Sequence, residues 1–422
     1  MSESANGDVI VFLNLRRTPL EQRATLTAAH RLGYGVALIA DSPPADLPRE
    51  IVRVVHKVDT FDDAAVDAAV KAIAADHTIA GIVTWSDPGV ESVSRIAAER
   101  GLPAPSPAAA EVARNKYLMR RSLADRPDLI PAFAQVVTWD ETVTAAARIG
   151  YPLVLKPVSG NGSKGIHTVR NDDELRSAYD QLSRYVRPDV DRVFTGHSGE
   201  IIIEEFLVGT EHSVEGWVHR GTVYIAGVTD KITTPDYHLE TGHLFPSALA
   251  PDRLESVHDL TRAVVSAFGI DDCAFHLECM VHPEGGVKLV ECAARGGGDF
   301  IISHLVGLAT GEPFCENTIR VATGQEPVLG TKPALHAGLT RILGTQEGTL
   351  QAIDGLGEAL TVAGVEHIAI ERTPGNAVRV PPADFVSSGI LSVIATGDSR
   401  AAVEASLEAA EKAITVRVCD AG

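Results

Sequence analysis

Positive charge is scarce in this chain of 422 residues. Lysine and arginine number 37, against 56 for aspartate and glutamate, so the formal net charge is −19 with histidine neutral. A surface of that charge repels a phosphate backbone at long range, which excludes nucleic acid from the partners that we expect. Any phosphate group that the protein binds must be held by a local basic or glycine-rich pocket.

Long hydrophobic runs are also missing. No stretch approaches the roughly 18 apolar residues of a membrane-spanning helix, and residues 1–11 lack a basic segment followed by an apolar one. We therefore expect a cytoplasmic protein without a membrane partner.

The cysteines are few, odd in number and without a Cys-x-x-Cys pair. This pattern supports neither a disulfide framework nor a zinc site. We expect free buried thiols at Cys273, Cys279, Cys292, Cys315 and Cys419.

Strand and helix patterns alternate through the first hundred residues. They predict strands at 8–15, 35–40, 51–55 and 79–84, and helices at 19–31, 62–76 and 88–100. Thr18 and Pro19 are a suitable cap and first residue for the first helix. The alternation is typical of a parallel, doubly wound α/β sheet. The turn Asn14–Arg17 lacks the glycines of a dinucleotide fingerprint, which disfavours a nicotinamide or flavin cofactor.

The chain is long enough for two or three domains of about 150 residues each. A helix carrying Asn115 and Lys116 follows the proline-rich segment 101–107. The patterns beyond it predict strands at 151–158, 165–169, 200–207, 213–217, 222–228, 274–281 and 287–294, and a helix at 171–186. The region from about Pro333 closes with a helix at 399–414 and a strand at 415–418, which indicates a third, smaller α+β unit.

A glycine-rich loop, Ser159-Gly160-Asn161-Gly162-Ser163-Lys164-Gly165, lies between two predicted strands. Its glycines can adopt positive φ and let backbone N–H groups approach an anion such as a triphosphate. The loop is not a Walker loop, because Gly-Lys-Ser/Thr before a helix is missing, and an ordinary flexible hairpin is the alternative.

Charged residues interrupt two of the apolar strands. Lys156 needs a partner if it is buried, although an edge lysine can also reach solvent. The strand at 200–207 ends in Glu204 and Glu205, and Glu211 follows. Such a strand end can offer backbone groups to a flat base, whereas the acids alone are ordinarily a solvated rim.

The hairpin 275–293 carries the strongest signal. If residues 283–286 form its turn, His282 pairs with Val287, and Glu278 lies directly opposite Glu291. Two such charges about 4 Å apart repel by roughly 4 kcal/mol at an effective dielectric constant near 20, so a cation should lie between them. Oxygen ligands beside a phosphate site favour Mg²⁺ over zinc. The alternative is a proton shared by the two carboxylates or a shifted register. Because side chains alternate between the two faces of a sheet, Arg295, four residues after Glu291, is expected on the same face as the pair.

These elements together resemble the ATP-grasp superfamily, specifically its carboxylate–amine ligases such as L-amino acid ligases and carnosine synthase-like enzymes. The resemblance rests on six features in order along most of the chain. They are Arg114-Asn115-Lys116, the strand with Lys156, the glycine-rich loop, Glu204-Glu205-Phe206-Leu207 with Glu211, Glu278, and Glu291-x-x-x-Arg295-Gly-Gly-Gly-Asp299.

The resemblance implies an α/β fold with a Rossmann-like N-terminal domain (1–112), an ATP-grasp domain (113–330) with a mobile lid (about 130–205), and an α+β C-terminal domain (331–422). It implies ATP and one or two Mg²⁺ ions as cofactors, with Mn²⁺ as a substitute. Small-molecule carboxylates and amines are the implied substrates. The resemblance does not decide whether the protein is a homodimer.

Residue roles follow from the same resemblance. Nucleotide contacts are implied for Lys116, Lys156, Gly160, Gly162, Ser163, Lys164, Glu204, Glu205, Leu207 and Glu211. Glu278 and Glu291 would hold Mg²⁺, and Arg295 and Lys231 would contact the transferring phosphoryl group. Many members carry a metal-binding asparagine where this chain has Ala293, so the second ion would need another ligand.

The implied reaction is ADP-forming ligation through an acylphosphate. A carboxylase that uses carboxyphosphate, as biotin carboxylase does, and a catalytically silent nucleotide-binding protein are the alternatives. His243 and His276 are further polar groups near the expected cleft, although a satisfied core or surface histidine explains each equally well.

Overall fold

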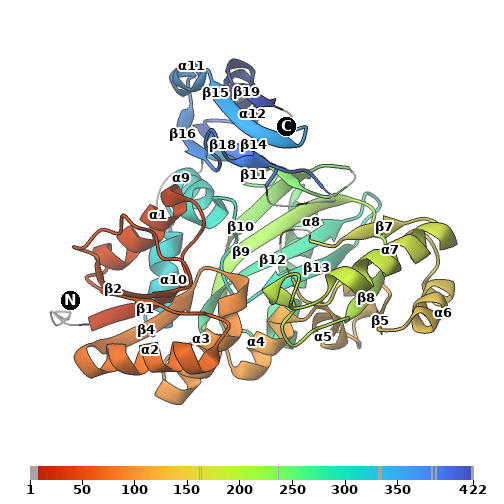
Figure 1. Ribbon diagram of the computed structural model, residues 1–422, viewed down its shortest axis with the longest axis horizontal. Coiled ribbons are helices and arrows are strands. Elements are labelled where there is room, and N and C mark those ends of the chain that lie inside the picture. Colours follow the sequence, from red (N-terminus) through yellow and green to blue (C-terminus); the bar gives the residue numbers. More distant parts are fainter. Residues whose placement is uncertain are drawn as a thin grey trace.

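The computed structural model describes residues 8–160, 162, 164–235, 237–330, 335–381, 384 and 387–419. Ser163 lies outside these residues. Figure 1 shows an N-terminal unit, a long central sheet, a smaller unit beside it and a C-terminal unit above.

The N-terminal unit is a parallel four-stranded sheet in the order β3-β2-β1-β4 with helices on both faces. Its elements are β1 (Asp8–Leu13), α1 (Pro19–Arg31), β2 (Gly35–Ala40), β3 (Val52–Lys57), α2 (Asp63–Asp76), β4 (Thr78–Thr84) and α3 (Val90–Arg100). Alternate residues of β1 enter two separate cores, Ile10 and Phe12 in one and Val9 and Val11 in the other. The predicted doubly wound architecture is confirmed.

Thr18 caps α1 as expected, because its side chain accepts from Glu21 N and Pro19 is the first helical residue. The helix predicted through Asn115 is instead broken there into α4 (Pro107–Arg114) and α5 (Lys116–Arg121). The Asn115 side chain accepts from Tyr117 N and Leu118 N, so this residue starts a new helix and turns Lys116 to a new direction.

A mixed α/β unit spans most of residues 133–205. Its antiparallel sheet has the order β5-β8-β6-β7, and its elements are β5 (Phe133–Val136), α6 (Trp139–Ile149), β6 (Leu153–Pro157), β7 (His167–Val169), α7 (Asp172–Tyr185) and β8 (Ile201–Glu205). It has its own core of apolar side chains. We call it the lid unit, after the lid that the resemblance implies at about 130–205.

An antiparallel sheet of eight strands forms the centre of the molecule, in the order β13-β12-β9-β10-β11-β14-β18-β16. Its first five strands are β9 (Thr210–His219), β10 (Thr222–Thr233), β11 (Glu240–Phe245), β12 (Cys273–Val281) and β13 (Val287–Ala293), with helix α8 (Pro251–Phe268) packed against β12 and β13. The helical turn Ile301–Leu305, α9 (Val306–Thr310) and α10 (Phe314–Ala322) follow.

The C-terminal unit extends this same sheet. Strands β14 (His336–Leu343), β18 (Gly389–Gly397) and β16 (Val365–Ile370) continue it beyond β11. The other elements are β15 (Gly348–Asp354), α11 (Leu356–Thr361), β17 (Ala377–Val378), α12 (Arg400–Ala413) and β19 (Thr415–Cys419). The expected α+β unit is therefore present, but it shares a sheet with the central domain.

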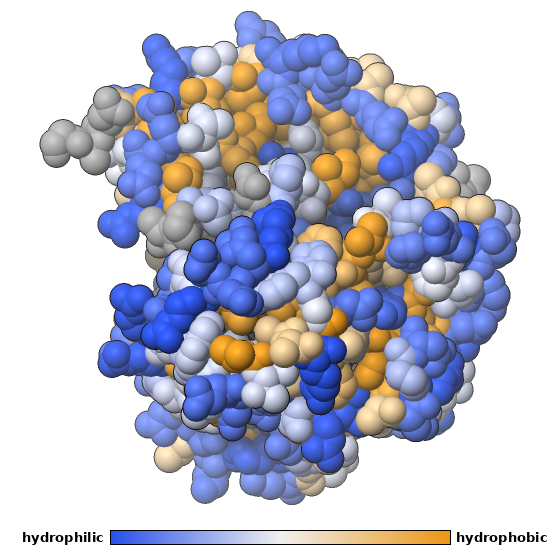
Figure 2. Space-filling view, turned by 90° about the vertical axis from the view of Figure 1, so that its right-hand side faces the viewer, coloured by the Kyte–Doolittle hydropathy of each residue, from blue (hydrophilic) through white to orange (hydrophobic). Residues whose placement is uncertain are grey.

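Viewed from the lid side, the molecule is hydrophilic over much of its lower part, and apolar side chains gather in the upper part, where the C-terminal unit lies (Figure 2). Among the described residues, every helix is too short or too polar to cross a membrane. All five cysteines are free, and Cys279, Cys292 and Cys315 are buried as expected. Cys273 is half-buried and Cys419, on the last strand, is exposed, so the expectation of burial is wrong at Cys419.

Candidate active site

A cavity of about 610 Å³ lies between the lid unit and the central sheet. Strands β6 and β8 and the glycine-rich loop line it from one side, and β9 to β13 from the other, with Lys116 at the start of α5. Almost all of the site residues predicted from the sequence meet here. They are Lys116, Lys156, Gly160, Gly162, Lys164, Glu204, Glu205, Leu207, Glu211, Lys231, Glu278 and Glu291.

The glycines of the loop adopt the backbone conformation expected of them. Gly160, Gly162 and Gly165 have φ values of 130°, 65° and 71°, which side-chain-bearing residues rarely adopt. Lys116 Nζ donates to the carbonyl oxygen of Gly160 at 3.1 Å, and Lys164 pairs with Asp191 at 2.6 Å. The loop is thus held beside the cavity by two lysines.

Lys156 is buried and finds its partner in Glu204. The two side chains are 2.7 Å apart, and Arg120, which is fully buried, donates to the same carboxylate at 2.8 Å. Burial opposes the charge of Glu204, but Arg120 and Lys156 hold the pKa of this carboxyl below its ordinary value. The ion pair with Glu204 therefore fixes the position of the Lys156 side chain at the cavity wall.

The neighbouring Glu205 has a different environment. Its carboxylate is part-exposed, pairs with Lys288 at 2.9 Å and accepts from Ala132 N. Leu207 follows in the segment after β8 and lines the cavity. Backbone groups of this segment are thus placed at the cavity wall, where a flat base could meet them.

Glu278 and Glu291 lie directly opposite each other on β12 and β13, as predicted. The expected pairing of His282 with Val287 is wrong, since Val281 pairs with Val287. The turn is one residue longer than expected, and a bulge next to Glu278 shifts the register back by one residue. The two deviations cancel, so the carboxylates face each other.

Cations lie against this pair as the charge argument requires. Lys231 Nζ is 2.7 Å from Glu278 and 2.7 Å from Glu211, and Lys116 Nζ is 2.9 Å from Glu291. Burial opposes the charge of Glu278, but Lys231 and His276 hold the pKa of this carboxyl well below its ordinary value. Each carboxylate of the pair is thus bound by a different lysine.

His276 links Glu278 to a buried carboxylate. Its ring nitrogens lie 2.5 Å from Glu215 and 3.1 Å from Glu278. Burial lowers the pKa of His276, but the two carboxylates outweigh it and raise the value to about 10. Glu215 also accepts from Gly297 N at 2.9 Å, which ties this network to the glycine run after Arg295.

Arg295 is the described site residue that stays outside the cavity. Its guanidinium makes a two-point ion pair with Asp87 of the N-terminal unit, at 2.8 and 2.5 Å, and also donates to Gly296 O. Burial opposes its charge, but Asp87 raises the pKa of Arg295 above its ordinary value. A contact with a phosphoryl group therefore requires Arg295 to turn from Asp87.

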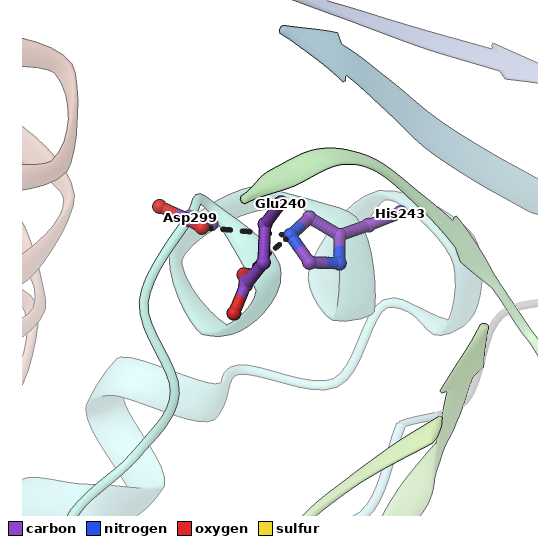
Figure 3. Close-up of side chains that lie close together, drawn as sticks. All are labelled: Glu240, His243 and Asp299. Carbon is purple, nitrogen blue, oxygen red and sulfur yellow. Dashed lines mark ion pairs between the residues drawn. The ribbon is translucent and has the colours of Figure 1, made fainter. Parts of the chain in front are cut away.

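Glu240, His243 and Asp299 form a further cluster, with their side chains close together (Figure 3). Their ligand atoms lie within 4.8 Å of one another, a spacing suited to a metal ion. However, Arg341 binds Asp299 through two hydrogen bonds, at 2.6 and 3.1 Å, and Lys231 lies 3.1 Å from Glu240. These carboxylates are already balanced by protein cations, so the cluster does not call for a metal.

Several residues of the site escaped the sequence analysis. Arg120 lies four residues after Lys116, so the helical spacing places both on one face and could have indicated it. Glu215 and Glu240 gave no such signal, because only the pairing of distant strands brings them to the site.

The donor set fits a hard divalent cation. Glu278 and Glu291 present opposed carboxylate oxygens at a cavity that is also lined by four lysines and a glycine-rich loop. Oxygen ligands shared between carboxylates and substrate phosphates are the usual environment of Mg²⁺. Lys116 and Lys231, which pair with these carboxylates, would then share the carboxylate oxygens with the bound ion.

Comparison with known proteins agrees with this geometry. Three protein-family models match the chain. The ATP-grasp N-terminal domain matches residues 26–104, the ATP-grasp domain matches residues 149–304, and L-amino acid ligase C-terminal domain 2 matches residues 341–419.

Two relatives and one structure are similar over much of the chain. Alanine–anticapsin ligase of Bacillus subtilis is 26% identical over 303 residues, which cover 66% of this chain and 63% of that protein. Carnosine synthase 1 of Homo sapiens is 25% identical over 285 residues, 65% of this chain and 34% of that one. The crystal structure of L-amino acid ligase from Bacillus licheniformis matches with a TM-score of 0.82 at 22% identity, over 98% of this chain and 99% of that one.

The order of the domains, the cavity and these similarities agree with one another. The chain belongs to the ATP-grasp superfamily of ligases, with the domain plan of the L-amino acid ligases.

Proposed function

We propose that this protein is an ADP-forming carboxylate–amine ligase that acts on amino acids. The observation that carries the proposal is the meeting, in one cavity, of Lys116, Lys156, the glycine-rich loop and the opposed pair Glu278 and Glu291. A triphosphate and a divalent cation suit that set, and the match of the C-terminal unit to L-amino acid ligases favours amino acid substrates over bicarbonate.

The roles of the residues follow from their positions. Lys116 and Lys156 would contact the nucleotide phosphates, and the backbone around Glu205 and Leu207 would meet the adenine. Glu211 would accept from the ribose hydroxyls. Gly160, Gly162 and Lys164 would cover the phosphates as part of the lid unit, which would exclude water from a reactive intermediate.

Phosphoryl transfer depends mainly on positioning and charge neutralisation. Glu278 and Glu291 would hold Mg²⁺, which supplies charge neutralisation at the phosphate oxygens. Lys231, which bridges Glu211 and Glu278, would move to the transferring phosphoryl group as the substrates enter. Arg295 would leave its ion pair with Asp87 and contact the same phosphoryl group.

The reaction then has two balanced steps. A carboxylate oxygen bonds to the γ-phosphorus as the bond to ADP breaks, which gives an acylphosphate. The amine nitrogen next bonds to the acyl carbon, the carbon–oxygen bond to phosphate breaks, and the nitrogen loses a proton. Phosphate is a better leaving group than hydroxide, which is why ATP is needed.

A substrate matrix tests this proposal. Purified protein with ATP and Mg²⁺ should release ADP only when an amino acid or other carboxylate and a suitable amine are both present. Mass spectrometry should then find a product that weighs the sum of the two minus water. ADP release that needs bicarbonate would indicate a carboxylase instead, and nucleotide binding without ADP release from any pair would indicate a silent protein.

A further inference from the structure

A second, smaller cavity of about 180 Å³ adjoins the first, and the two share Gly162 and Glu240. Residues from the N-terminal unit, the central domain and the C-terminal unit line this side cavity. The N-terminal unit supplies Arg17, the central domain Glu240 and Asp299, and the C-terminal unit Arg341 and Glu371. Its volume is below the roughly 300 Å³ at which pockets for drug-sized ligands begin, so it suits a small molecule.

The charges at the side cavity are separated in space. The carboxylates of Glu240 and Asp299 retain 26% and 27% side-chain exposure, and Glu240 also lines the first cavity. Arg341 is only 12% exposed and is occupied by Asp299 and Glu371, and Glu371 is 2% exposed. Glu240 and Asp299 keep their pairing with Lys231 and Arg341, but their partly exposed oxygens can accept from a further donor. The Arg17 guanidinium is the accessible cation of this cavity.

Arg17 has donors to spare. Its side chain is 54% exposed, and within the described part of the chain its Nη2 contacts one carboxylate, that of Glu371. A guanidinium carries five N–H donors in a planar fork that matches a carboxylate. A second carboxylate can therefore bind Arg17 without displacing Glu371.

The backbone around Arg17 is fixed in place. Arg16 donates to the carbonyl oxygen of Gly296 at 2.7 Å, and Gln22 donates to Arg16 O at 2.8 Å. Strand β1 lies between β2 and β4, so this turn follows the carboxyl end of the strand where the order of the sheet reverses. Open α/β sheets bind ligands at that position. The turn that lacks the dinucleotide glycines is thus placed for another ligand.

We propose that the side cavity binds the attacking amine as an amino acid, with Arg17 binding its carboxylate and Glu240 and Asp299 its ammonium group. This inference rests on the proposed function. A simple anion would meet two carboxylates here, and a simple cation would meet Arg17, whereas an amino acid satisfies both ends. Its nitrogen lies beside Glu240, at the junction with the cavity where an acylphosphate would form.

The test compares two substrates in two proteins. Wild type and Arg17→Ala are assayed for ADP release with the amino acid that the matrix identifies as the amine and with its carboxamide, which keeps the amine but lacks the carboxylate charge. Arg17→Ala should raise the KM for the amino acid about 10- to 100-fold, as expected for loss of a charge-assisted hydrogen bond. The KM for ATP should stay the same.

The carboxamide makes the test specific. Wild type should use it with a raised KM, and Arg17→Ala should add little further loss, because the interaction is already absent. Arg17→Lys should fall between the two proteins. Arg31→Ala is the matched control, since Arg31 is also an N-terminal arginine with one surface ion pair, to Glu316.

An equal loss for amino acid and carboxamide, or no loss for either, overturns the assignment of Arg17 while the ligase activity of wild type still stands. If wild type releases ADP with no pair of substrates, the proposed function fails and this inference fails with it.

Discussion

Turnover should fall by three or more powers of ten when Glu278 or Glu291 is replaced by glutamine. Each substitution keeps the shape of the side chain but removes one charge of the opposed pair, and with it part of the proposed Mg²⁺ site. Metal ions supply several kcal/mol of charge stabilisation in such reactions, and each 1.36 kcal/mol is a factor of ten in rate.

The fold should survive these two substitutions. In Glu278→Gln, Lys231 keeps Glu211 at 2.7 Å and Glu240 at 3.1 Å as partners. ADP release measures the activity, Mn²⁺ titration measures metal binding, and circular dichroism checks the fold. Glu284→Gln is the control, because Glu284 is an exposed glutamate in the turn of the same hairpin. Near-normal ADP release by either variant at ordinary Mg²⁺ would refute the metal assignment.

A large loss of stability is expected from Glu204→Ala. The substitution leaves Arg120 and Lys156 buried without their shared carboxylate. Breaking a buried ion pair from one side typically costs about 3–5 kcal/mol, because the remaining charge is uncompensated. The free energy of local opening, from hydrogen exchange at amides of β6 and β8, should fall by about this amount.

The neighbouring residue is a matched control for this prediction. Glu205 pairs with Lys288 at the surface, where both side chains are about a third or more exposed. Exposed pairs contribute roughly 0–1 kcal/mol, so Glu205→Ala should change the opening free energy little. Equal losses in the two variants would show that the arrangement of Arg120, Glu204 and Lys156 is not the source of stability.

Most of the site could be predicted because its residues lie on short local patterns. The glycine-rich loop, the strand with Lys156 and the hairpin of Glu278 and Glu291 each fit within a few residues of sequence. The opposed pair was found even though the turn was placed one residue off, since the bulge at Glu278 offset the error. That success depended on two deviations that the sequence did not reveal.

The remainder depends on contacts between distant parts of the chain. The pairing of Arg295 with Asp87 joins residues 208 positions apart, and no periodicity indicates it. The extension of the central sheet into the C-terminal unit likewise rests on the pairing of β11 with β14. The break at Asn115 is different, because asparagine is a favoured helix cap and the sequence carried that signal.

The central claim is that a carboxylate is activated by the γ-phosphoryl group of ATP. It is tested most directly by supplying the carboxylate substrate with ¹⁸O in its carboxyl group, together with ATP, Mg²⁺ and the amine. An acylphosphate route predicts ADP and inorganic phosphate that carries one ¹⁸O atom from the carboxylate. Formation of AMP and pyrophosphate, with the label in AMP, would mean adenylation and would contradict the account.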